Sequence, residues 1–225
     1  MDNIEKNLPR VVSREEWLEE RRALLVKEKE LTRQYDRVSA ERRELPWVKV
    51  EKNYVFDTPD GKRTLVELFD GRSQLIVYHF MFGPGWKEGC SGCSFVADHI
   101  DGANLHLAHH DVTVLAVSRA PLAEFLPFKQ RMGWYFTWVS SHGSDFNYDY
   151  QVSTASGEET HGLSVFFKNV SGEVFHTYST YARGVDILLG AHHYLDLTPK
   201  GRNEQGTMSW MRHHDRYDED LRDVS

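Results

Sequence analysis

The chain has 225 residues, 40% of them hydrophobic, and a formal net charge of -7. This length suits one domain with an appendage, and the hydrophobic content predicts a packed core rather than disorder. The negative charge argues against a nucleic-acid binder or an anionic-membrane binder, since both carry a basic surface excess. The N-terminus has no signal-peptide pattern, and the longest apolar stretch, 75–82, is too short to span a bilayer. We therefore expect a cytoplasmic protein.

Residues 13–45 have the pattern of one long, highly charged helix. Ser13 followed by Glu16 is a capping-box signature, and Pro46 ends the segment. An apolar residue recurs every seven positions, at Trp17, Leu24, Leu31 and Val38. This narrow apolar stripe favours a helix packed on its own domain. The alternative is a dimerising arm that joins two copies of the chain.

The rest of the chain predicts an α/β domain. A hairpin is expected over residues 47–64, with Thr58–Gly61 as its turn. Strands at 74–82, 112–118 and 136–139 alternate with helices at about 91–110 and 121–132, and a hairpin around Ser171-Gly172 and a helix at 184–193 follow. Such alternation predicts a partly parallel central sheet covered by helices. We assign 1–46 to a helical arm, 47–200 to the domain and 201–225 to a polar tail.

The two cysteines of the chain, Cys90 and Cys93, are three positions apart. Random placement would give this spacing in about one sequence in a hundred. Cys90 follows a buried strand and a glycine-rich turn, and Cys93 falls in the first turn of the next helix, where free N–H groups favour an anion. The context therefore predicts a reactive thiolate at Cys90. Redox dithiol chemistry is favoured; half of a metal site and two inert buried thiols are the alternatives.

Several long segments occur in order within residues 10–217: IVYHFMFGPGW, GCSGCSF, VSRAPL, RMGWYFTWVSS, GSDFNYD, VFHTYSTYARG, HHYLDLTP and RHHDRY. In these segments the chain resembles the thioredoxin-like, largely bacterial proteins grouped as domain-of-unknown-function family 899. The resemblance implies a thioredoxin-like or peroxiredoxin-like fold, with a mixed central sheet flanked by helices. It also implies a dithiol-disulfide oxidoreductase role.

In that role Cys90 would attack a disulfide and form a mixed disulfide, which Cys93 would resolve. The substrate would be a disulfide-containing protein or a small thiol compound. An external dithiol reductant would restore the pair, because no flavin, nicotinamide or other cofactor site is recognisable in the sequence. No nucleic acid or membrane is expected as a partner.

The sequence departs from the thioredoxin pattern in three places. Where thioredoxins carry a cis-proline before the final hairpin, this chain has His161–Leu163, so Gly162 is a candidate supporting residue. Thioredoxins place a tryptophan directly before the first cysteine, whereas Trp86 lies four residues earlier. No residue matches their buried acid, so Glu88, Asp98 or a water would have to move protons.

Arg119 follows one predicted parallel strand, and residues 140–145 follow another. Residues that follow different parallel strands gather at one sheet edge, so both are expected to face the Cys90 loop. There Arg119 would stabilise a thiolate or pair with a carboxylate.

Two other functions remain as alternatives. One is a thiol peroxidase, in which Cys93 captures a sulfenic acid formed at Cys90, although the Pro-x-x-x-Thr-x-x-Cys signature is absent. The other is a non-catalytic metal-binding or scaffold protein.

The 12 histidines do not favour a metal site. His106 and His110 are one helical turn apart, and a solvated helix end explains them. His79 in a buried strand is interpreted as a hydrogen-bonded core residue, and His213 and His214 in the tail are expected to be exposed. Because two thiolates leave half of a tetrahedral shell empty, we expect no zinc at the cysteine pair.

Overall fold

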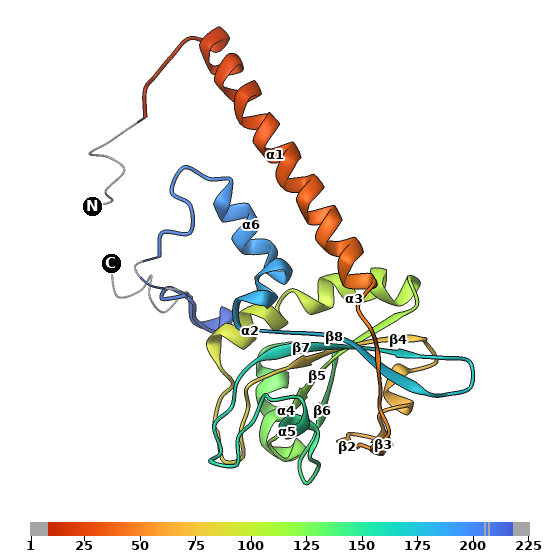
Figure 1. Cartoon of the computed structure of the whole chain (residues 1–225). Coiled ribbons are helices and arrows are strands. Elements are labelled where there is room, and N and C mark those ends of the chain that lie inside the picture. The colour runs from red at the N-terminus through yellow and green to blue at the C-terminus, as the bar shows by residue number, and fades with distance from the viewer. Residues whose placement is uncertain (1–8, 205, 207, 218–225) are drawn as a thin grey trace. The chain divides into compact units, whose positions relative to one another are not determined.

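The computed structural model describes residues 9–204, 206 and 208–217, and the chain divides into two compact units between Pro46 and Trp47 (Figure 1). The first unit contains one long helix, α1 (Arg14–Arg43). Ser13 caps α1 through the predicted capping box: the Glu16 N–H donates to Ser13 Oγ at 3.2 Å, and the Ser13 N–H donates to the Glu16 carboxylate at 3.0 Å. The helix ends ahead of Pro46, as expected.

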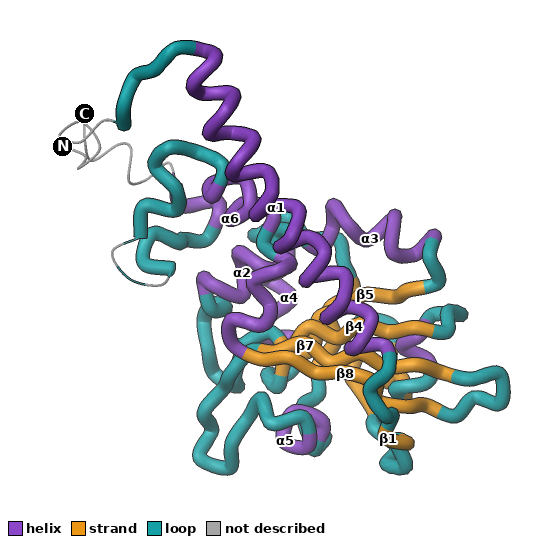
Figure 2. Tube along the Cα trace, turned by 45° about the horizontal axis from the view of Figure 1, so that its top comes forward, coloured by secondary structure: helices purple, strands orange, loops and turns teal. Residues whose placement is uncertain are grey.

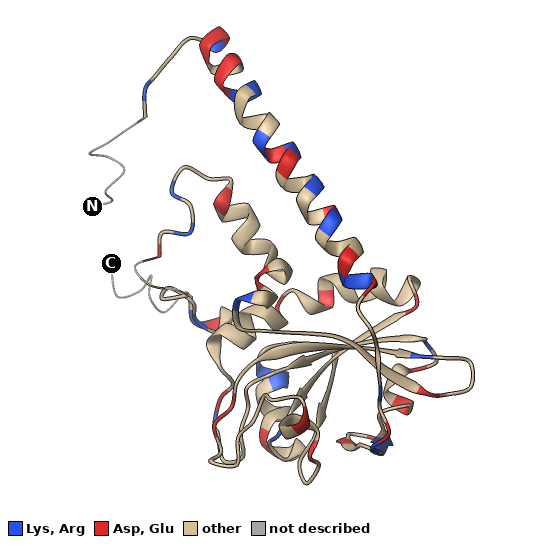
Figure 3. Ribbon diagram, in the orientation of Figure 1, with Lys and Arg blue, Asp and Glu red and all other residues tan. Residues whose placement is uncertain are grey.

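Acidic and basic side chains alternate along the length of α1 (Figure 3). Arg21 pairs with Glu28 at 2.8 Å, and Arg37 pairs with Glu30 at 2.8 Å. The seven-residue stripe is well exposed, from 39% at Val38 to 72% at Leu31. The helix thus presents a narrow apolar band between charged side chains.

In the described part of the chain, the second unit is built around an eight-stranded mixed sheet, ordered β1-β8-β7-β4-β5-β6-β2-β3. The strands are β1 (Val48–Lys49), β2 (Val55–Thr58), β3 (Gly61–Thr64), β4 (Gln74–His79), β5 (Val112–Ser118), β6 (Thr137–Ser140), β7 (Gly162–Lys168) and β8 (Val174–Tyr181). Strands β4, β5 and β6 are parallel, whereas β7 is antiparallel to β4 and β8 is antiparallel to β7. This is the thioredoxin-like mixed sheet expected from the sequence.

Helices cover both faces of this sheet, and Figure 2 shows α2 and α3 on one side and α5 on the other. The α-helices are α2 (Ser91–Ala97), α3 (Ile100–His109), α4 (Leu122–Arg131), α5 (Phe146–Asp149) and α6 (Gly190–Asp196), and the 3-10 helices are η1 (Glu67–Phe69), η2 (Ala182–Leu188) and η3 (His214–Arg216). Successive side chains of β4 alternate between two apolar cores: Tyr78 packs with α2, α3 and α4, and Val77 packs with η1 and α5.

Two predicted elements differ from the structure. Residues 47–64 do not form one hairpin, because β1 pairs with β8 instead, with Val48 opposite His176. The single helix expected over 91–110 is broken between α2 and α3. At the break, His99 Nδ1 donates to the Phe95 carbonyl at 2.7 Å and His99 Nε2 accepts from the Ala191 N–H at 3.1 Å. These side-chain bonds compete with the helical hydrogen bonds there.

Candidate active site

The loop between β4 and α2 is anchored at both sides before it reaches the cysteines. The Phe80 N–H donates to the Val117 carbonyl at 2.9 Å, and the Ala120 N–H donates to the Phe82 carbonyl at 3.0 Å. A Cβ on Gly89 would stand 2.5 Å from the Phe80 ring, so only glycine allows this close approach. The apolar loop residues thereby fix where the next helix begins.

Cys90 is the N-cap residue of α2 and is partly exposed, while Cys93 lies one turn into the helix and is 1% exposed. Both are free thiols. The Met81 N–H donates to Cys93 Sγ at 3.5 Å, and the Ser94 N–H donates to the Cys90 carbonyl at 2.9 Å. The pair therefore combines one accessible sulfur and one buried sulfur.

The surroundings push the two thiols apart in acidity. A hydrogen bond from the Cys93 thiol is the largest cause that lowers the pKa of Cys90, to about 6. Backbone N–H groups of Cys93 and Gly92 and the imidazole of His161 lower this pKa further, and burial opposes them. Burial, together with the neighbouring Cys90, raises the pKa of Cys93 well above its usual value. At neutral pH the pair is thus a Cys90 thiolate beside a Cys93 thiol.

A cavity of about 180 Å³ lies beside Cys90, and its lining is largely apolar. Val96 of α2, Val185 of η2 and Met208 contribute to its walls, and His161 lines it ahead of β7. Arg183 and Asp186, which pair at 2.9 Å, are its charged members. The cavity gives an uncharged group access to the Cys90 sulfur.

The two acids proposed to move protons are engaged with other side chains. Glu88 pairs with Arg131 at 2.5 Å and with Arg216 at 3.0 Å, and these two guanidinium groups hold the pKa of its carboxyl below the usual range. Asp98 accepts a hydrogen bond from Trp134 Nε1 at 2.7 Å and contacts His214 Nδ1 at 2.7 Å. Glu88 is therefore ionised at neutral pH and holds no proton for the cysteines.

Residues 208–217, called the C-terminal strap below, pack over the cysteine loop. Arg131 Nη2 donates to His213 Nδ1 at 2.9 Å, so the opposite nitrogen, Nε2, donates to the Gly89 carbonyl at 2.9 Å. Arg131 also pairs with Asp215 at 2.9 Å. His213 is consequently 6% exposed, and the expectation that it is exposed was wrong. Side-chain partners from distant parts of the chain bury it.

The remaining predicted residues lie around the site without lining the cavity beside Cys90. Trp86 packs on Phe82, with ring centroids 6.5 Å apart. Arg119 pairs with Glu159 at 2.5 Å, which is the carboxylate-pairing alternative for this residue. Gly162 begins β7, and a Cβ there would stand 2.6 Å from the Tyr181 ring.

His79 is a buried, hydrogen-bonded core histidine, as expected. Its Nε2 lies 2.8 Å from Ser164 Oγ, and burial lowers its pKa to about 3. Within residues 9–204, 206 and 208–217, no group of three or more His, Cys, Asp or Glu side chains is arranged to hold a metal ion. Among the helices of the same residues, none is both long and apolar enough to cross a bilayer.

The sequence did not single out four contributors to the site: Tyr78, the Met81 N–H, His161 and Met208. Tyr78 alternates with Val77 in a buried strand, so its direction toward the cysteine helix could be inferred once that helix was assigned to one face. His161 could be noticed because it directly precedes Gly162. No local pattern marks Met208, because its place depends on the fold of the strap.

The model of the family described as "Bacterial protein of unknown function (DUF899)" matches residues 6–217. No curated protein matches the chain in sequence. Among solved structures, the peroxidoxin BcpB from Mycobacterium tuberculosis is 13% identical with a TM-score of 0.49, covering 65% of this chain and 94% of that chain. A mutant of PrxQ from Xylella fastidiosa is 14% identical with a TM-score of 0.46, covering 66% and 94%. Thioredoxin peroxidase I from Plasmodium yoelii is 16% identical with a TM-score of 0.43, covering 72% and 97%.

Proposed function

The chain belongs to the bacterial family of unknown function DUF899, and we propose that it acts there as a dithiol-disulfide oxidoreductase. The observation that carries the proposal is the contrast within the Cys-Ser-Gly-Cys segment. Cys90 is accessible with a pKa of about 6, and Cys93 is buried with a pKa well above its usual value. A nucleophile and a protonated resolving thiol are what disulfide exchange requires.

The reaction proceeds in two exchanges. The Cys90 thiolate attacks one sulfur of a substrate disulfide, forms a mixed disulfide and releases the other substrate sulfur as a thiolate. Cys93 then loses its proton and attacks Cys90 Sγ, which forms the Cys90–Cys93 disulfide and releases the second substrate thiolate. The substrate gains two electrons and the protein loses two. An external dithiol reductant returns the pair to the reduced state in the cytoplasm, the setting we propose.

The cavity beside Cys90 bears on the substrate. Val96, Val185 and Met208 offer apolar walls to the group attached to the attacked sulfur. The charged members Arg183 and Asp186 pair with one another, so they provide no excess charge for a strongly ionic ligand. We propose disulfides flanked by apolar groups, in proteins or in small molecules, as the preferred substrates.

The test measures reduction of a protein disulfide with a dithiol as the terminal reductant. Full-length wild-type protein should reduce it catalytically, and Cys90→Ser should abolish the reaction. Cys93→Ser should also stop turnover but should accumulate a mixed disulfide, detected by mass spectrometry. Full activity in both variants would contradict the proposal.

The same samples test the two alternatives. Consumption of a hydroperoxide faster than reduction of any disulfide, lost in Cys90→Ser, would support the thiol peroxidase. One zinc per chain in the reduced protein, lost in Cys90→Ser, would support the metal-binding alternative.

A further inference from the structure

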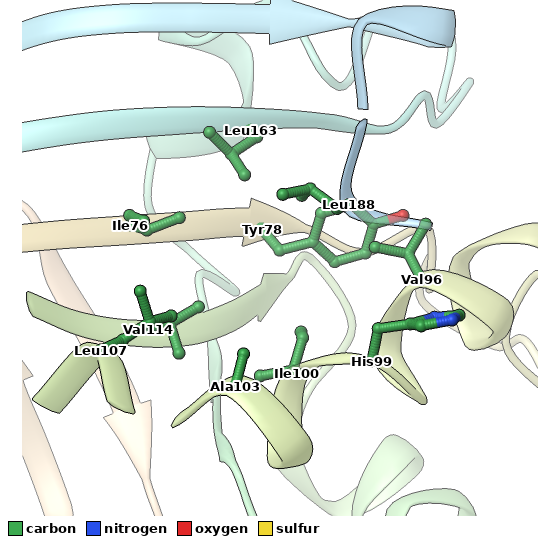
Figure 4. Close-up of a pocket in the computed structure, with 10 residues that line it drawn as sticks. All are labelled: Ile76, Tyr78, Val96, His99, Ile100, Ala103, Leu107, Val114, Leu163 and Leu188. Carbon is green, nitrogen blue, oxygen red and sulfur yellow. The ribbon is translucent and has the colours of Figure 1, made fainter. Parts of the chain in front are cut away.

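Tyr78 carries a buried hydroxyl beside the cysteine helix. It lies near the end of β4, opposite Ala116 of β5 and Leu163 of β7, and it is 1% exposed. Figure 4 shows the oxygen end of its ring between Val96 of α2 and Leu188. Among the residues that the structure describes, the Tyr78 hydroxyl meets hydrogen-bond geometry with none. A buried hydroxyl without a partner is costly, and a phenylalanine would pack there without that cost.

The space around this hydroxyl offers few polar groups. The ring lines a largely apolar cavity of about 110 Å³, whose other walls include Ile76, Ile100 and Val114 (Figure 4). His99 also lines it, but both of its ring nitrogens are occupied, by the Phe95 carbonyl and the Ala191 N–H. The hydroxyl therefore has no stable partner on the cavity side.

On the other side stands Cys93, close enough that each group alters the pKa of the other. Cys93 and Tyr78 belong to the same core, and the Met81 N–H reaches the Cys93 sulfur at 3.5 Å. Burial raises the pKa of Tyr78 well above its usual value, so the phenol keeps its proton at neutral pH. It is then available as a hydrogen-bond donor.

No other acid in the described site serves Cys93. Glu88 is held by two arginines, and Asp98 is held by Trp134 and His214. A buried thiolate with no donor would pay the full cost of burying a charge. The step that makes Cys93 a nucleophile therefore needs a local donor.

We propose that Tyr78 is a catalytic residue of the resolving step, in which its hydroxyl and the Met81 N–H together donate hydrogen bonds to the Cys93 thiolate. This inference rests on the proposed disulfide exchange. Cys93 gives up its thiol proton, which ends on the departing substrate thiolate or in solvent, and its electron pair forms the bond to Cys90 Sγ while the bond from Cys90 to the substrate sulfur breaks. Tyr78 keeps its own proton throughout. In the reverse direction, it stabilises Cys93 as the leaving thiolate when an external dithiol reduces the pair.

The test compares full-length wild-type protein with Tyr78→Phe, using a small aromatic disulfide that releases a coloured thiolate. The first release reports attack by Cys90, and the second reports resolution by Cys93. In Tyr78→Phe the first phase should keep its rate and pH profile. The second phase should slow by about tenfold to a hundredfold, since a hydrogen bond to a charged group is lost. Its pH profile should move upward by about one unit or more.

Tyr54→Phe is the matched control, because Tyr54 is also buried but its hydroxyl donates to Asp149, at 2.7 Å, in the other core. It should leave both phases unchanged. Equal slowing of both phases in Tyr78→Phe, or no slowing of the second, would overturn the inference.

A second measurement is independent of turnover. In a Cys90→Ser background, the alkylation pKa of Cys93 should rise when Tyr78→Phe is added, and an unchanged pKa would refute the role of Tyr78. If wild-type protein instead releases no coloured thiolate while Tyr78→Phe still raises the Cys93 pKa, the proposed function has failed and the contact has not.

Discussion

Met208 lies against Gly92: a Cβ built on Gly92 would stand 3.0 Å from Met208 Cε, and both residues line the cavity beside Cys90. A methionine from the C-terminal strap thus forms part of the wall next to the nucleophile. Met211 is buried in the core that holds Cys93, so the strap is attached to this region by apolar packing as well as by ion pairs. The first two predictions concern this arrangement.

Met208→Ala should make Cys90 react faster with a neutral alkylating agent, by about two- to tenfold, because the shortened side chain uncovers the sulfur. The pH midpoint of alkylation should hardly change, since Met208 carries no charge. The measurement is the alkylation rate of the reduced protein by mass spectrometry. Leu197→Ala, at a residue 84% exposed, is the control. A rate equal to that of the wild type would show that Met208 does not limit access.

Arg131→Gln should loosen the strap, because Arg131 pairs with Glu88 and Asp215 and donates to His213. We expect a loss of stability of about 1 to 2 kcal/mol and faster hydrogen exchange confined to the strap and the cysteine loop. Arg183→Gln, which breaks an exposed pair with Asp186, is the control for general charge removal. Uniformly faster exchange over the whole domain would contradict a local role.

His79 should make the domain sensitive to acid. Burial lowers its pKa to about 3 in the folded state, while the unfolded chain binds a proton at its usual, higher pKa. Stability is therefore complete above the unfolded pKa and is lost as the pH falls from about 6.5 toward 3, by roughly 1.4 kcal/mol for each unit crossed. Unfolding by urea at several pH values measures this slope.

His79→Gln should reduce that slope, because glutamine can still bond to Ser164 but does not take up a proton. His106→Gln, on an exposed position of α3, should not. The account of His79 fails if the two variants show the same dependence on pH.

The dimerising arm stays a prediction. If the exposed stripe of α1 joins two copies, removal of residues 13–45 should give a folded monomer, whereas the full chain should scatter light as a dimer. The mass from light scattering decides it, and an unchanged mass for both forms would sink the idea.

The sequence predicts some features of this protein well, and the reasons are local. Capping by Ser13, the parallel strands and the position of Cys90 at a helix start follow from side-chain periodicity and from backbone groups a few residues away. The break at His99 does not, because it depends on Ala191 from a distant element.

Side-chain partners across the fold were beyond the sequence for the same reason. Glu88 and Asp98 look like free acids near the cysteines, yet their partners include Arg216 and His214 from the strap. The place of Tyr78 near Cys93 likewise depends on how a strand and a helix pack.

The most direct test of the central claim is the pH dependence of alkylation at each cysteine in the reduced, full-length protein, measured by mass spectrometry. The account predicts that Cys90 is the faster thiol, with a midpoint near pH 6, and that Cys93 stays unmodified through neutral pH. Faster reaction at Cys93, or a Cys90 midpoint at or above the value of about 8.5 for a free cysteine, would contradict it.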